Sequence, residues 1–137
     1  MEGTRMRTGA SLAEALKGLL AEWSERTGIT VEVWALPTAD VPSRVAKGVL
    51  TVMAEGLDNV ARHSQASTVS IAVTVAPSGL RLTISDDGKG FQPPPTGPGI
   101  ARMRAAFAEL GGSVSVTGVP EQGATVTGVV PGAGHIT

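Results

Sequence analysis

Apolar positions recur along the chain with two spacings, one typical of helices and one typical of strands. The first helical stripe predicts a helix that opens at Ser11 and stops at Gly28, and the capping-box sequence Ser11-Leu12-Ala13-Glu14 supports that start. Ile29–Trp34 then alternates as a strand does. The apolar residues of the helical stripe are Leu12, Leu16, Leu19, Leu20 and Trp23.

A second, longer helix is predicted from an N-cap at Asp40 to about His63. Two alternating runs, Thr68–Ala76 and Leu80–Ser85, are separated by a short turn and predict a hairpin. A third helix, a Gly-Gly stop and a closing pair of strands follow. The third helix is marked by Ile100, Met103, Phe107 and Leu110, and the closing strands by Val114–Thr117 and Ala124–Val130.

This order of elements predicts an α+β two-layer sandwich. We expect one mixed, mainly antiparallel sheet with three helices on one face, which leaves the other face exposed or available for contact. The chain has 137 residues, too few for two independent cores. We therefore predict a flexible start over residues 1–10, one domain over residues 11–131 and a tail over residues 132–137.

Composition excludes several classes of protein. A net charge of −1 and 3% aromatic residues argue against nucleic acid as a partner. With no cysteine and only two histidines, disulfides, cysteine-ligated zinc and a three-histidine metal site are excluded. Neither a signal peptide nor an apolar run of the roughly 20 residues that span a bilayer is present, so we expect no membrane contact by this segment.

The second predicted helix carries an unusual polar stripe. Glu55, Asn59 and Arg62 fall on one narrow stripe, with His63 beside it. A carboxylate, an amide and a cation next to a Leu/Val core are compatible with a ligand site. They are equally compatible with a solvated helix edge.

Two glycine-rich segments add to this stripe. Asp86-Asp87-Gly88-Lys89-Gly90-Phe91 directly follows a strand, where glycines let the backbone approach a ligand and a carboxylate accepts from an amino group. Gly97-Pro98-Gly99-Ile100 opens a helix, whose N-terminal N–H groups favour an anion. Taken alone, the first is compatible with a plain turn and the second with a flexible loop. Together, and in this order, the three segments supply the parts of a magnesium-nucleotide site.

On these residues the chain resembles the ATP-binding fold shared by sensor histidine kinases, DNA gyrase, the ninety-kilodalton heat-shock chaperones and the mismatch-repair ATPases. The resemblance is closest to the catalytic domain of two-component sensor histidine kinases with a short lid. Residues 55–67 are similar to the family's N box, residues 84–91 to its G1 box and residues 97–112 to its G2 box.

The resemblance implies roles for four residues of the N box. Asn59 would ligate Mg²⁺, and Glu55 would orient or deprotonate the acceptor imidazole. Arg62 would face the phosphates, with His63 beside them.

The resemblance also implies roles for the two glycine boxes. Asp86, rather than Asp87, would accept hydrogen from the adenine amino group. The glycines would let the backbone approach the nucleotide and flank the lid over its phosphates. These glycines are Gly88, Gly90, Gly97 and Gly99.

The chain departs from the family pattern at several places. The loop Gln92–Thr96 is short, Pro98 stands between the lid glycines, and Arg102 stands where the family has Gly. Ala124 replaces a frequent Thr or Ser. Thr125 is adjacent, but strand alternation predicts that it points to the other face.

The resemblance implies that the chain binds Mg-ATP and transfers the γ-phosphoryl group to a histidine on a separate dimerisation domain, with a response regulator downstream. Neither His63 nor His135 is expected to be the acceptor. It further implies a cytoplasmic location, free or as part of a membrane-anchored kinase. Two alternatives stay open: an anti-sigma-factor serine kinase, and a non-enzymatic ATP-binding module of the same fold.

Overall fold

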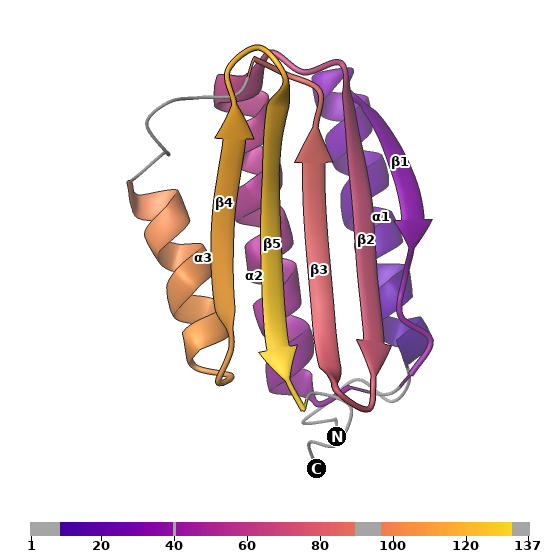
Figure 1. Ribbon diagram of the computed structural model, residues 1–137. Helices are drawn as coiled ribbons and strands as arrows, with labels where there is room; N and C mark the ends of the chain where they lie inside the picture. The colour runs from indigo at the N-terminus through magenta and orange to yellow at the C-terminus, as the bar shows by residue number, and fades with distance from the viewer. Residues whose placement is uncertain (1–8, 40, 90–96, 133–137) are drawn as a thin grey trace.

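The computed structural model describes residues 9–39, 41–89 and 97–132. Within these ranges the chain forms three α-helices, one π-helical turn and one five-stranded sheet (Figure 1). The helices are α1 (Gly9–Thr27), α2 (Ser43–Asn59) and α3 (Pro98–Ala108), and the π-helical turn η1 (Val60–Ser64) continues α2. The strands are β1 (Thr30–Ala35), β2 (Thr68–Ala76), β3 (Gly79–Asp86), β4 (Ser113–Val119) and β5 (Gly123–Pro131).

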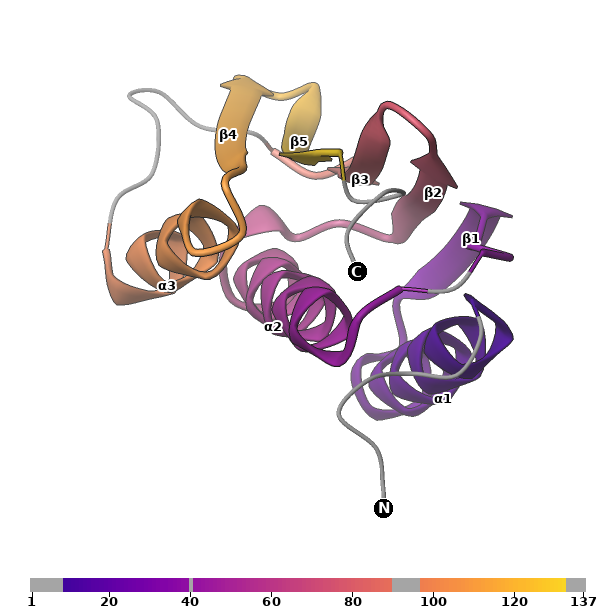
Figure 2. The same ribbon diagram turned by 90° about the horizontal axis from the view of Figure 1, so that it is seen from below.

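The sheet and the helices form two layers, and all three described helices lie on the same face of the sheet (Figure 2). The strand order is β1-β2-β3-β5-β4, with β1 parallel to β2 and the other pairs antiparallel. The predicted two-layer sandwich with a mixed, mainly antiparallel sheet is therefore confirmed.

The central strand β3 carries a row of apolar side chains on its helix-facing side, and this row ends in a polar residue. Leu80, Leu82 and Ile84 are buried against the helices, while Arg81 between them is exposed. Because side chains alternate along a strand, Asp86 is the next residue on the helix-facing side. The buried apolar row of β3 thus ends in a carboxylate.

Helix α2 lies in the middle of the helical layer and buries a continuous apolar stripe (Figure 2). Gly56 belongs to this stripe. A Cβ atom there would lie 2.5 Å from Ile84 Cδ1 and 3.8 Å from Met103 Sδ. The absence of a side chain therefore lets α2 approach β3 and α3 at one point.

Two predicted helix starts differ from the structure. Helix α1 begins at Gly9, so Ser11 lies inside the helix rather than at its N-cap. Helix α2 begins at Ser43 with Pro42 as its N-cap, and the Pro42 carbonyl accepts from Ala46 N–H at 3.0 Å. The fixed φ of proline suits a helix start without a side-chain cap. Asp40, the predicted cap, lies outside the described residues.

Candidate functional site

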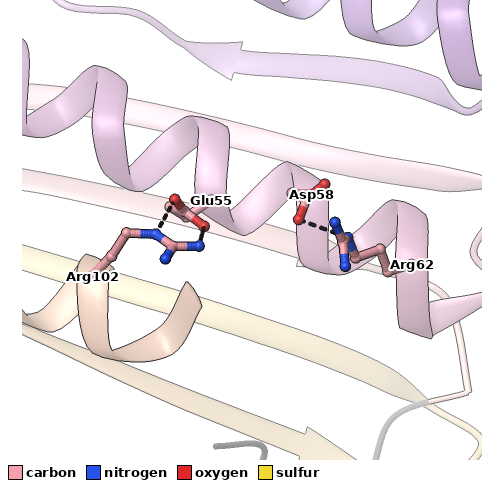
Figure 3. Close-up of polar contacts among 4 residues, drawn as sticks. All are labelled: Glu55, Asp58, Arg62 and Arg102. Carbon is pink, nitrogen blue, oxygen red and sulfur yellow. Dashed lines mark hydrogen bonds and ion pairs between the residues drawn. The ribbon is translucent and has the colours of Figure 1, made fainter. Parts of the chain in front are cut away.

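The site residues of α2 meet the first turns of α3. Glu55 accepts two hydrogen bonds from Arg102, with Nε at 2.6 Å from Oε2 and Nη2 at 3.2 Å from Oε1. The two side chains point toward one another across the gap between the helices (Figure 3). The Glu55 side chain is 20% exposed, and that of Arg102 is 58% exposed. This ion pair joins the predicted N box to the predicted G2 box.

Asn59 lies one helical turn after Glu55 and faces the same point on α3. A Cβ atom on Gly99 would lie 3.2 Å from Glu55 Oε1 and 3.6 Å from Asn59 Oδ1. Two side-chain oxygens of α2 therefore converge on the backbone of the first turn of α3. Glycine at this position keeps the space between them open.

The first turn of α3 has backbone N–H groups that no helix carbonyl accepts. Gly97 is its N-cap with φ at 124°, and Pro98 occupies the first turn. The hydrogen bond from Ala101 N–H to the Gly97 carbonyl, 3.0 Å long, is the first of the helix. The N–H groups of Gly99 and Ile100 precede it and have no acceptor within the helix. Together with the helix dipole they favour an anion.

Arg62 has a partner on its own helix. Its Nε lies 2.9 Å from Asp58 Oδ2, and its side chain reaches back along the helix toward Asp58 (Figure 3). Both side chains are largely exposed. His63 falls in η1, and its side chain lies outside the described part of the structure. The predicted stripe is thus split, because Glu55 and Asn59 face α3 while Arg62 bonds along α2.

Asp86 is half-buried at the end of β3. Its Oδ1 accepts from Gly88 N–H at 2.8 Å. Burial raises the pKa of Asp86 above its ordinary value of 3.8, hydrogen bonds from the Gly88 and Ala124 N–H groups oppose this, and the charge of Asp87 adds to it. A carboxylate held in such surroundings has acceptor capacity left for a ligand.

Asp87 serves the fold instead. Its Oδ1 accepts from the N–H groups of Ser67 and Thr68 at 2.9 and 3.0 Å, and its Oδ2 from the Ser67 hydroxyl at 3.0 Å. These hydrogen bonds, that of Thr68 N–H foremost, lower the pKa of Asp87 below 3.8, against a smaller effect of desolvation. Asp87 thereby ties the end of β3 to the start of β2.

The neighbouring strand β5 completes the surroundings of Asp86. Ala124 pairs with Asp86, and Thr125 pairs with Ser85 on the opposite face, with 2.7 Å between the two hydroxyl oxygens. The predicted orientation of Thr125 is confirmed. A Cβ atom on Gly123 would clash with the Asp86 carbonyl, and its φ of 100° also favours glycine. The backbone beside Asp86 is therefore closely packed.

Other predicted parts lie outside the described residues, namely Gly90, Phe91 and the loop Gln92–Thr96. In the part of the chain that is described, no three His, Asp or Glu residues gather as a metal cage. Mg²⁺ is commonly held by one or two protein oxygens together with substrate phosphates. Asn59 Oδ1, beside the start of α3, fits that mode of binding.

Residues 44–133 match the family described as histidine kinase-, DNA gyrase B- and HSP90-like ATPases. The chain belongs to this family. In this chain Glu55 and Asn59 of α2 face Gly99 at the start of α3, and Asp86 lies at the end of β3.

Similar proteins include sensor histidine kinases. The sensor histidine kinases LiaS and LnrJ of Bacillus subtilis (strain 168) are each 32% identical to this chain, over 90% and 85% of its length. The chain covers 35% and 29% of those proteins. The histidine kinase domain of the Erythrobacter litoralis EL346 blue-light activated kinase superposes with a TM-score of 0.77 at 25% identity, over 96% of this chain and 65% of that one. No helix among the described residues is both long and apolar enough to cross a membrane.

Sequence reasoning missed two interactions of the site. The Glu55–Arg102 pair joins residues 47 positions apart, and no periodicity links them. The Asp87–Ser67 contact spans 20 positions and was likewise not anticipated. The Asp58–Arg62 pair had a signal, since an acidic residue four positions before a basic one is a favourable helix pair.

The two adjacent aspartates should affect stability in opposite directions. The pKa of Asp87 is lowered, so its ionised form stabilises the fold above the ordinary aspartate range, and this contribution is lost as pH falls through the lowered pKa. The pKa of Asp86 is raised, so its ionisation costs stability at neutral pH, and the cost disappears as pH falls through the raised pKa. We expect Asp87→Asn to lower the free energy of unfolding at pH 7 by about 1 kcal/mol, a value discounted for its exposure. Asp86→Asn should leave it equal or higher.

Urea unfolding of both variants between pH 3 and pH 7 measures these effects, in roughly one-unit steps around the ordinary aspartate range. The acid limb of Asp87→Asn should be flatter than that of the unmodified chain. Loss of stability in Asp86→Asn with none in Asp87→Asn would show that the two carboxylates have the reverse roles.

Proposed function

We propose that this chain binds Mg-ATP and is the catalytic domain that transfers the γ-phosphoryl group to a histidine on a separate dimerisation domain. The observation that carries the proposal is the convergence of Glu55 Oε1 and Asn59 Oδ1 on Gly99, at the start of α3. Membership of the ATPase family and the similarity to proteins named sensor histidine kinases support it. A response regulator would accept the phosphoryl group downstream.

The phosphates would lie at the first turn of α3. There the N–H groups of Gly99 and Ile100 and the helix dipole favour negative charge. Asn59 would hold Mg²⁺ through Oδ1, because the amide oxygen faces the same turn. When bound, the metal neutralises charge that develops on the transferring phosphoryl group. Arg62, and His63 beside it, would add positive or hydrogen-bonding groups near this end of α2.

The adenine would lie against the end of β3. The half-buried carboxylate of Asp86 would accept a hydrogen bond from the exocyclic amino group, while its Oδ1 is already oriented by Gly88 N–H. Gly88 is buried, and with Gly90 it would let the backbone approach the base. Asp87 is occupied by Ser67 and Thr68 and would take no part in recognition.

Transfer itself would depend on positioning. Glu55 Oε1 would accept the N–H of the incoming imidazole, so that its other ring nitrogen faces the γ-phosphoryl group. The remaining contributions are in-line orientation and charge neutralisation, which is how phosphoryl transfer is generally catalysed.

Because ATP is the proposed substrate, we place this activity in the cytoplasm, where the chain acts free or as part of a membrane-anchored kinase. Gly97 and Gly99 would flank the lid.

Recognition of adenine should depend on Asp86 far more than on Asp87. Asp86→Asn removes a charge-assisted acceptor, worth roughly 1.5–3 kcal/mol, so affinity for Mg-ATP should fall on the order of ten- to a hundredfold. Asp87→Asn, which changes a contact to β2, should bind within about threefold of the unmodified chain. Calorimetry with Mg-ATP and Mg-GTP measures affinity and selectivity. Equal losses in the two variants would place the adenine contact elsewhere, and no binding to the folded chain would contradict the proposal.

Phosphoryl transfer should need a supplied acceptor. With radiolabelled ATP the chain alone should stay unlabelled, and a cognate dimerisation domain should become labelled on histidine. Glu55→Ala should abolish transfer while much of the ATP affinity remains, because the carboxylate acts on the imidazole. Asn59→Ala should weaken both, because Mg²⁺ serves binding and chemistry.

Three outcomes distinguish the alternatives. Label on serine, rather than on histidine, of a supplied protein substrate would favour the anti-sigma-factor serine kinase. ATP binding without transfer to any acceptor would favour a non-enzymatic module. Stable label on His63 or His135 in the chain alone would contradict a separate acceptor.

A further inference from the structure

Arg102 is the residue of α3 that reaches back to Glu55. Its guanidinium donates through Nε and Nη2 to the two carboxylate oxygens, which is the bidentate arrangement that fixes geometry as well as charge. Both hydrogen bonds described for Glu55 come from this one side chain. Arg102 has no role of its own in the proposed reaction.

The two hydrogen bonds are unequal. Nε lies 2.6 Å from Oε2, whereas Nη2 lies 3.2 Å from Oε1. Oε1, the more weakly held oxygen, is also the one that faces Gly99 beside Asn59 Oδ1. Each carboxylate oxygen has two acceptor sites, so Oε1 keeps one for a further donor. The pair thus anchors Glu55 through one oxygen and presents the other at the start of α3.

A glutamate without this anchor has several rotatable bonds and no other described partner. Its carboxylate would leave the start of α3 for solvent part of the time, because the side chain is 20% exposed and borders open surface. Arg102 is 58% exposed, so the pair contributes little to global stability. Its main effect is therefore on where the carboxylate lies.

We propose that Arg102 is a positioning residue for phosphoryl transfer: it holds Glu55 so that Oε1 faces the point where the acceptor imidazole and the γ-phosphoryl group meet. This inference rests on the proposed function. Arg102 itself touches neither reactant in this role. It acts through Glu55, and its loss should affect turnover more than ATP binding.

The test is a double-mutant cycle on phosphoryl transfer to the supplied domain. Arg102→Ala should lower kcat by about 10- to 100-fold, as expected when a reacting group is misplaced by about 1 Å. KM for ATP and the unfolding temperature should change little. Arg102→Lys, which keeps the charge but offers a single donor nitrogen in place of the two-nitrogen fork, should restore part of kcat.

Whether Arg102 acts through Glu55 is decided by the coupling between substitutions at these two residues in their effects on kcat. To keep residual transfer measurable, the cycle uses Glu55→Gln. In that background Arg102→Ala should have no further effect on kcat. Arg81→Ala, which removes an exposed arginine from the opposite face of the sheet, is the matched control and should leave kcat unchanged. Independent, multiplying effects of the two substitutions, an unchanged kcat in Arg102→Ala, or a faster one, would each overturn the inference.

A second measurement separates this inference from the proposed function. In nuclear magnetic resonance the Nε–H proton of Arg102 should exchange slowly in the unmodified chain and rapidly in Glu55→Ala. If the chain transfers no phosphoryl group although this proton is protected, the proposed function fails and the anchoring of Glu55 by Arg102 stands. If the proton is unprotected in the unmodified chain, the inference is overturned whatever the rate of transfer.

Discussion

The close approach of α2 to β3 and α3 at Gly56 is the constraint on which the candidate site depends. A side chain there would overlap the Ile84 Cδ1 atom, so either Ile84 would have to repack or α2 would have to move away from β3. Glu55 immediately precedes this contact and Asn59 follows it by one turn. Their oxygens reach the first turn of α3 because the helix backbone lies this near.

The same contact relates the two ends of the site. Ile84, which fills the space left by Gly56, is the last buried apolar residue of β3, and Asp86 follows two positions later on the same face. The apolar layer beneath α2 therefore connects the proposed adenine position to the proposed phosphate position. The stability of this layer and the geometry of the site have a common origin, namely the packing of one helix over one strand.

The neighbouring aspartates Asp86 and Asp87 have different surroundings in the fold. Strand alternation directs Asp86 toward the helices, whereas Asp87 follows the end of β3, where three donors from Ser67 and Thr68 hold it. Desolvation raises the pKa of Asp86, whereas hydrogen bonds lower that of Asp87. Under the proposed function, the carboxylate that is costly for the fold is the one that would contact the nucleotide, as expected where function competes with stability.

The spacing of apolar residues was sufficient to predict the strands, the three helices and the face that each helix buries. These features depend on the local sequence. The same spacing did not predict where α1 and α2 begin. Several adjacent residues can start a helix at nearly equal free energy, so a cap residue such as Ser11 does not fix the first turn. The Glu55–Arg102 pair was not predictable from spacing, because it depends on how α2 and α3 pack. The glycine boxes indicated a nucleotide site, but the convergence on Gly99 needed the structure.

The central claim is that the nucleotide lies between the end of β3 and the start of α3. Backbone amide chemical shifts recorded during titration with Mg-ATP test it most directly. The account predicts saturable shifts at Gly88, at Gly99 and Ile100, and around Asn59, with little change at Ser115 and Thr127 on the opposite face of the sheet. Shifts confined to that opposite face, or saturation without any change at Gly88 and Gly99, would contradict it.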